Sequence, residues 1–372
     1  MPSRRRPLPL LRWLPPPPPP PSLPRLRLRA WSSRCGPERV DVRCGTAGHV
    51  SVRLFNGAHD ARNRHALVIH LPSSPAVDDD AAAPLPTFLQ HLPVAQINYR
   101  WGGDASRAFH WPRPVHETSF AYAWLHANLA PPSNAGRDIF VFGSHLGASL
   151  AASLALTETH DNAKFDIRGL VAYNGIYNWT MFMPEHRINK LASKTSPSVQ
   201  KLQSRLPSLF RRPSDLLDPF ASPSLFFHSP GLLAPRWFAS ANDDDDTVWD
   251  QDEQAATVSL KPPRKSLSVF PPPKSSLRIP ETFLLHHDGG DDNGTKAVGH
   301  SLRSQARELA LLMRRSIVES EKRGTVEWDE KEDADVADEE AQMRVQAVDA
   351  GPLTDEAGFM ALDWMRERTD AM

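Results

Sequence analysis

Short runs made mostly of apolar residues, spread through the middle of the 372-residue chain, constrain its fold most. Such a run is typical of a strand that is buried on both faces of a sheet. The runs are Ala66 to Leu71, Val94 to Tyr99, Ile139 to Phe142, Gly169 to Tyr173 and Thr282 to Leu285. Ahead of them, the stretch from Val50 to Leu54 alternates apolar with polar residues, which predicts an antiparallel strand at the start of the sheet.

Helical patterns separate and follow these runs. One opens near Glu117, a second is the alanine- and leucine-rich segment from Gly147 to Glu158, and a third extends from Leu302 to Ile317. Strands that alternate with helices are typical of an α/β domain. The sequence therefore predicts a doubly wound, mostly parallel sheet.

The alternation stops between about residues 178 and 274, where loops rich in serine and proline and an acidic run occur. This stretch predicts a large insertion, partly helical around Ser198 to Phe210. The two ends of the chain differ from the middle in charge, because residues 1–37 hold eight arginines and no acid, whereas residues 319–372 hold 17 acids and six bases. We therefore expect a basic arm over 1–38, an α/β domain over 39–318 and an acidic tail over 319–372. Both charged tails are expected to be disordered, apart from a short docking helix at Phe359 to Trp364.

The arginine-rich, acid-free N-terminus is typical of a mitochondrial presequence. The proline run from Pro15 to Pro21 argues against it, because an import helix cannot continue through proline. A basic arm, or an upstream stretch wrongly included in the gene model, remains the alternative, so the expected location is cytoplasmic or mitochondrial. No run is long enough to span a bilayer, and a net charge of -1 gives no general attraction to nucleic acid.

The segment that begins at Asp138 carries the most specific motif. A strand leads into a tight turn at Gly143 to Gly147 and out into a helix, which resembles the nucleophile elbow, G-x-S-x-G, of α/β-hydrolases. The residues two positions before and after the centre must be small, so that strand and helix can approach each other. This spacing places His145 at the centre and Ser144 one position early. Centring the motif on Ser144 would put Phe142 and Leu146 where small residues are required.

Further segments in the same order extend the resemblance. Residues 66–74, which end in Leu71–Pro72–Ser73–Ser74, stand where these enzymes carry the loop of oxyanion-stabilising N–H groups. The segment from His110 to Glu117 looks like the approach to the helix before the elbow strand. From Val40 to Ile317 the chain resembles a divergent branch of the α/β-hydrolase fold superfamily, familiar from filamentous fungi, whose members often lack the elbow serine.

This resemblance implies a degenerate catalytic apparatus. Pro72 has no N–H to offer an oxyanion, so only the N–H of Leu146 is left for that role. The catalytic acid would follow the strand that ends at Leu285, where Asp288, Asp291 and Asp292 stand. The base would follow one further helix and a strand at about Thr325 to Trp328, yet no histidine occurs after His300.

The resemblance and the missing groups together predict a pseudoenzyme that binds a small apolar ligand or a protein partner. The expected ligand contacts are His70, Leu71, Ser73, His145 and Leu146. One alternative is a weak serine esterase, for which Ser144, Asp288 and His300 are the candidate catalytic residues. Another is a structural or regulatory protein that acts through its charged tails.

We expect no cofactor and no metal site. The chain has only two cysteines, too few for a metal site built on thiolates alone. The spacing of His286–His287–Asp288 fits no standard metal motif.

Overall fold

The computed structural model describes residues 36–60, 65–75, 83–103, 109–131, 136–183, 186, 188–189, 197–238, 263–287, 300–322, 332–354 and 356–370. Residues 1–35 of the predicted basic arm lie outside the described residues. So do Asp288, Asp291, Asp292 and the strand predicted at Thr325 to Trp328. The described residues belong to one compact unit that begins at Gly36.

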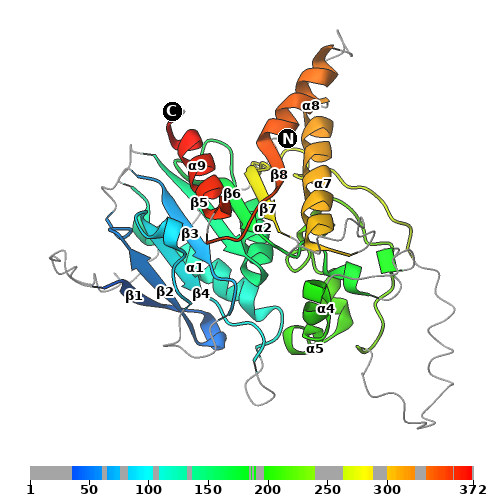
Figure 1. The fold of residues 1–372 in the computed structure, drawn as a ribbon, viewed down its shortest axis with the longest axis horizontal. Helices are drawn as coiled ribbons and strands as arrows, with labels where there is room; N and C mark the ends of the chain where they lie inside the picture. Colours follow the sequence, from blue (N-terminus) through cyan, green and yellow to red (C-terminus); the bar gives the residue numbers. More distant parts are fainter. Residues whose placement is uncertain are drawn as a thin grey trace, which may run out of the picture. The chain divides into compact units, whose positions relative to one another are not determined.

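Within the described residues, eight strands form one sheet in the order β1-β2-β4-β3-β5-β6-β7-β8 (Figure 1). The strands are β1 (Glu38–Arg43), β2 (His49–Phe55), β3 (Leu67–Leu71), β4 (Val94–Asn98), β5 (Arg137–Ser144), β6 (Phe165–Tyr173), β7 (Glu281–His286) and β8 (Val345–Asp349). β2 is antiparallel to β1 and β4, whereas β4, β3, β5, β6, β7 and β8 are mutually parallel. The predicted doubly wound, mostly parallel sheet is confirmed, and its architecture is that of the α/β-hydrolases.

Every residue of β3 and β4 is buried, including the polar residues His70, Gln96 and Asn98, as expected for strands covered on both faces. The predicted helices are also present as α1 (Arg113–Leu129), α2 (Leu146–Glu158) and α7 (Leu302–Lys322). Their buried residues pack with one face of the sheet, and those of α9 (Glu356–Asp370) pack with Phe140, Phe142 and Phe283 on the other. Both faces of the sheet are therefore covered, which keeps its central strands out of water.

The insertion lies between β6 and β7. Its described elements are short: η3 (Trp179–Phe182), α4 (Pro197–Gln203), α5 (Leu206–Leu209), η4 (Pro213–Leu217) and η5 (Pro223–Phe226). The partly helical character predicted around Ser198 to Phe210 is confirmed by α4 and α5. No helix among the described residues combines the length and the apolar character needed to cross a membrane.

The prediction of a disordered acidic tail from residue 319 is wrong for its larger part. α7 continues to Lys322, and α8 (Glu332–Arg344), β8 and α9 follow it. β8 pairs with β7 along its whole length, and α8 packs alongside α7 (Figure 1). The boundary at residue 318 is therefore too early, because a strand and a helix that complete the sheet come after it.

The docking helix predicted near the C-terminus is confirmed as part of α9, but it uses a different face. Of the residues expected to share its docking face, Phe359 is 66% exposed and Leu362 is partly exposed, whereas Trp364 is buried against the sheet together with Ala357, Ala361 and Met365. These residues recur at the three- and four-residue spacing of one helical face. Two alanines let the helix approach closely, so few large apolar residues are needed.

Candidate functional site

The turn between β5 and α2 is a single residue, since β5 ends at Ser144 and α2 begins at Leu146. His145 occupies it with φ 50° and ψ -115°, a conformation that residues with a Cβ rarely adopt. Its backbone N–H donates to the carbonyl oxygen of Tyr173, 2.8 Å away. The strained apex is thus fixed to the end of the neighbouring strand β6.

The two glycines that flank the apex explain the spacing of the motif. A Cβ at Gly143 would lie 2.5 Å from the carbonyl oxygen of Gly147, and a Cβ at Gly147 would lie 2.2 Å from that of Leu71. Neither position has room for a larger residue, because strand, helix and the end of β3 meet there. The elbow is therefore centred on His145, as its sequence predicts.

The side chains of Ser144 and His145 have opposite environments. Ser144 is 3% exposed and shares a sheet face with Phe140 and Phe142, because side chains alternate along a strand. The imidazole of His145 is exposed, and its ring meets that of Tyr173 edge-on with centroids 6.0 Å apart. Partial desolvation by the surrounding protein lowers the pKa of His145. A neutral imidazole, rather than a hydroxyl, is what the apex presents.

At the end of β3, most of the predicted ligand contacts are buried. His70 stacks on Phe142 with ring centroids 5.5 Å apart, and Nδ1 has no hydrogen-bond partner among the described residues. Burial lowers the pKa of His70 to about 3. Leu71 and Leu146 belong to the core. Of the five predicted contacts, only Ser73, which is partly exposed, and His145 are accessible. The predicted contact set therefore separates into two accessible residues and three buried ones.

His300, the candidate base, is buried at the start of α7. The amide nitrogen of Gln305 donates to its Nε2 at 2.7 Å, and its ring meets that of Phe182 with centroids 4.5 Å apart. Burial, and to a smaller extent the charge of His186, lower its pKa to about 4. The lone pair that a general base would use is occupied by Gln305.

The resemblance implies that the base follows one further helix and strand, and β8 is the described strand that comes after α7. The segment that follows β8 begins with Ala350, Gly351 and Pro352, none of which can take a proton. The carbonyl oxygen of Gly351 accepts a hydrogen bond from the hydroxyl of Tyr173 at 3.2 Å. This segment therefore fixes the end of β6.

One polar cluster at this end of the sheet was not predicted. His286 and Asp349 are register partners at the ends of β7 and β8, with Nδ1 and Oδ1 3.7 Å apart, and Asp349 is also paired with Arg303 of α7. The pairing could not be read from the sequence, because β8 was not recognised as a strand. Within the described residues, no group of three or more histidine, cysteine, aspartate or glutamate side chains is arranged to hold a metal ion.

An aromatic cluster fastens the insertion to the same end of the sheet. Trp101 follows β4, whereas Trp179 in η3 and Phe210 after α5 belong to the insertion, and none of the three is more than 1% exposed. The ring centroids of Trp101 lie 5.9 Å from Trp179 and 5.5 Å from Phe210. The indole N–H of Trp101 donates to the carbonyl oxygen of Leu209 at 2.9 Å. The cluster thus joins three separate segments above the strand ends.

No protein-family model matches the chain, and no curated protein sequence matches it. Solved structures are similar to it. Carboxyl esterase 2 from the mycorrhizal fungus Tuber melanosporum shares 12% identity, with a TM-score of 0.49 over 93% of this chain and 88% of that one. An esterase from the archaeon Pyrobaculum calidifontis shares 15% identity, with a TM-score of 0.48 over 91% and 86%. One of two esterases from Rhizomucor miehei shares 13% identity, with a TM-score of 0.48 over 90% and 82%. At these identities the likeness concerns the fold.

Proposed function

We propose that this chain is a non-catalytic protein on the α/β-hydrolase fold, which binds a small apolar ligand or a protein partner at the carboxyl ends of its parallel strands. The observation that carries the proposal is His145 at the apex of the elbow, with its imidazole exposed and no hydroxyl in its place. Crevices beyond the carboxyl ends of parallel strands are where proteins of this class hold ligands.

The nucleophile is the first requirement of serine-hydrolase chemistry, and it must project its hydroxyl into the site next to a base. Ser144 does not meet it, because its side chain is buried on the sheet face that carries Phe140 and Phe142. A change of the Ser144 rotamer cannot carry its hydroxyl from one face of the sheet to the other. Attack by Ser144 would therefore require β5 to change its register or its end to unfold.

The base is the second requirement. His300 accepts a hydrogen bond from Gln305, and Gln305 is itself fixed by the backbone N–H groups of Tyr177 and Asn178, which donate to its Oε1 at 2.9 and 2.8 Å. Taking a proton at Nε2 of His300 would break this contact and place a charge in a buried site. That cost opposes general-base catalysis.

His145 and Ser73 are the predicted contacts that a bound molecule can reach. A neutral imidazole offers one donor and one acceptor, which suits recognition of a carbonyl or hydroxyl group on an otherwise apolar molecule. Since α8, β8 and α9 are folded, a partner attracted by their acidic side chains would meet a structured surface.

The test uses the full chain with p-nitrophenyl butyrate. We expect hydrolysis no faster than in buffer, no labelling by a fluorophosphonate probe, and saturation-transfer NMR signals showing that the intact ester binds. His145→Trp, which would place a larger ring in the proposed crevice, is expected to abolish those signals, whereas His91→Trp on an exposed turn is the matched control. Turnover above buffer that disappears in Ser144→Ala would establish a serine esterase in place of a binding protein. An ester signal that His145→Trp leaves unchanged would exclude the proposed crevice.

A further inference from the structure

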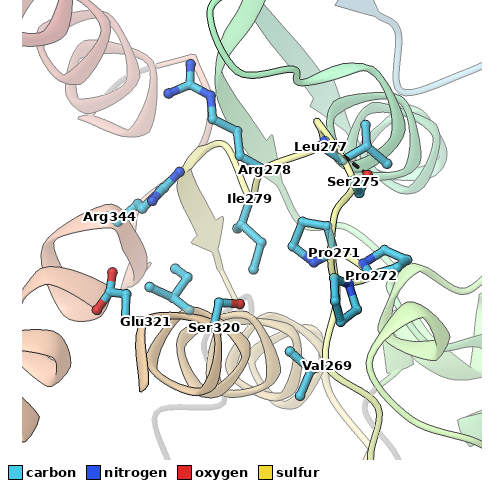
Figure 2. A pocket seen from close by; sticks show the side chains of 12 residues that line it. Val269, Pro271, Pro272, Ser275, Leu277, Arg278, Ile279, Ser320, Glu321 and Arg344 are labelled. Carbon is cyan, nitrogen blue, oxygen red and sulfur yellow. Dashed lines mark hydrogen bonds between the residues drawn. The ribbon is translucent and has the colours of Figure 1, made fainter. Parts of the chain in front are cut away.

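A cavity of about 330 Å³ lies near the amino ends of β7 and β8, whereas the elbow lies at the carboxyl end of β5. It is bounded by the segment 269–279 that leads into β7, by the end of α7 and by Arg344, the last residue of α8 before β8 (Figure 2). Because β5, β7 and β8 are parallel, the amino ends of β7 and β8 point away from His145. Nothing in the proposed function uses this cavity.

Most of its lining is apolar. Val269, Pro271 and Leu277 come from the segment before β7, while Ile279 and Ile317 are largely buried beneath the cavity. The hydroxyl of Ser316 on α7 holds the segment in place, since it accepts from the N–H of Phe270 at 2.8 Å and donates to its carbonyl oxygen at 2.6 Å. The wall is therefore fixed to the helix and preformed, as in small-molecule sites.

Arg344 brings a charge to this apolar space. Its side chain is half-buried and makes no hydrogen bond or ion pair with any other residue that the structure describes. Burial lowers the pKa of its guanidinium, and the charge of Arg278 lowers it further, whereas Glu340, Glu281 and Glu321 raise it. A half-buried cation without a hydrogen-bonded partner is costly, and an anion would relieve that cost.

Arg278 is the second cation on the lining, and its own hydrogen bonding is incomplete. Nε is buried without a hydrogen-bond partner among the described residues, and the carboxylates of Asp161 and Asp166 lie 4.0 and 3.9 Å from its nitrogen atoms, beyond hydrogen-bond distance. In Figure 2 the two arginines lie on one side of the cavity, across from Pro271 and Pro272. The polar end of the cavity is thus separate from its apolar end.

Glu321 limits which anion can enter. Among the lining residues it is the single carboxylate beside two guanidinium groups, and the carboxylates of Asp161 and Asp166 lie within 4.0 Å of Arg278 outside the lining. These carboxylates would repel a second negative charge on a bound anion, which favours a monoanion.

We infer that this cavity binds a small apolar monocarboxylate, with the carboxylate between Arg278 and Arg344 and the hydrocarbon part against the proline and isoleucine side chains. A guanidinium group donates two parallel hydrogen bonds to a carboxylate, a geometry that neither a neutral nor a cationic head group can use. The volume is at the lower end of the range for small-molecule sites, so the ligand is small.

Calorimetric titration of the full chain with octanoate tests the site, with octanol and octylamine as neutral and cationic controls. We expect octanoate to bind, octanol to bind at least tenfold more weakly and octylamine not to bind. Arg344→Gln and Arg278→Gln are each expected to weaken octanoate binding at least tenfold, and Ser320→Trp, at an exposed position on the rim, to block it. Arg315→Gln, an exposed arginine of α7 outside the lining, is the matched control and keeps wild-type affinity.

Thermal unfolding of each variant shows whether it is folded, and Ser320→Trp tests the cavity without removing a charge. Absence of octanoate binding to the wild-type chain would overturn the inference. So would equal affinity for octanol, or unchanged affinity in the two arginine variants and in Ser320→Trp. His145→Trp is expected to bind octanoate normally, so the outcome at this cavity is independent of the outcome at the elbow.

Discussion

The side-chain amide of Gln305 donates to Nε2 of His300 at 2.7 Å, while its carbonyl oxygen accepts from two backbone N–H groups of the segment that follows β6. One glutamine on α7 therefore joins the start of that helix to the beginning of the insertion. His300, the candidate catalytic base, is therefore held within an internal hydrogen-bond network.

Replacing Gln305 with leucine is expected to destabilise the chain. The N–H groups of Tyr177 and Asn178 would lose their acceptor while staying buried, at a cost of about 1–3 kcal/mol for each unsatisfied group. We therefore expect the free energy of unfolding to fall by about 2–4 kcal/mol, measured by urea denaturation. Gln203→Leu on the exposed side of α4 is the control, and a similar loss in both variants would contradict this role of Gln305.

Replacing His145 with glycine is expected to stabilise the chain, although it removes a side chain. Relief of a strained φ of 50° is worth about 1–3 kcal/mol, and the added flexibility of glycine in the unfolded state offsets part of it. The expected net gain is about 1 kcal/mol in the free energy of unfolding. His145→Ala keeps a Cβ and hence the strain, so it should show little gain. Equal stability of the two variants would mean that the backbone angle carries no measurable strain.

Stability is expected to fall below about pH 6.5 because His70 and His300 are buried in the neutral form. Their pKa values of about 3 and about 4 lie below the value of about 6.5 in an unfolded chain, so below pH 6.5 the unfolded state binds protons that the folded state does not. Each group then lowers the free energy of unfolding by up to about 1.4 kcal/mol per pH unit, and neither has an effect well above pH 6.5.

Unfolding in urea between pH 7 and pH 5 measures this dependence. His70→Phe retains the stacking on Phe142 and removes one titrating group, so its stability should depend less steeply on pH, by about 1.4 kcal/mol per pH unit at the acid end. His91→Phe, at an exposed position, should keep the wild-type slope. A His70→Phe variant with that same slope would show that His70 takes a proton in the folded state.

Trp364 tests whether the acidic C-terminal region belongs to the fold. Its ring stacks on Phe283 of β7 with centroids 5.5 Å apart and an interplanar angle of 3°. Trp364→Ala is expected to lower the free energy of unfolding by about 3–5 kcal/mol, because the cavity left under α9 cannot collapse fully. Phe359→Ala, on the exposed side of the same helix, should change it little. If Trp364→Ala leaves the free energy of unfolding unchanged, α9 does not contribute to the stability of the fold.

The central strands and the elbow could be predicted because their signals are local. A mostly apolar run identifies a strand buried on both faces. The small residues around His145 are required by contacts within a few residues of the turn, apart from the approach of Leu71. In both cases, the residues that make the pattern in the sequence are the ones whose size and polarity the packing requires.

β8, and the face by which α9 packs on the sheet, could not be predicted because their signals are not local. In β8, Val345, Ala347 and Val348 are too few to identify a strand, and the surrounding acidic residues are typical of a solvated tail. Its stability comes from pairing with β7, which lies far away in sequence. The same reason hid the contact between His286 and Asp349, and the cavity beside Arg344 depends on where α8 ends.

The position of β8 at residues 345–349 has a consequence for biosynthesis. Until those residues emerge from the ribosome, β7 is the outermost strand, and its peptide groups on that side are open to pairing with another chain. The sheet therefore reaches its final architecture only after residues 345–349 have been translated. A product that terminates before Val345 would expose the unpaired backbone groups of β7, and we expect it to aggregate.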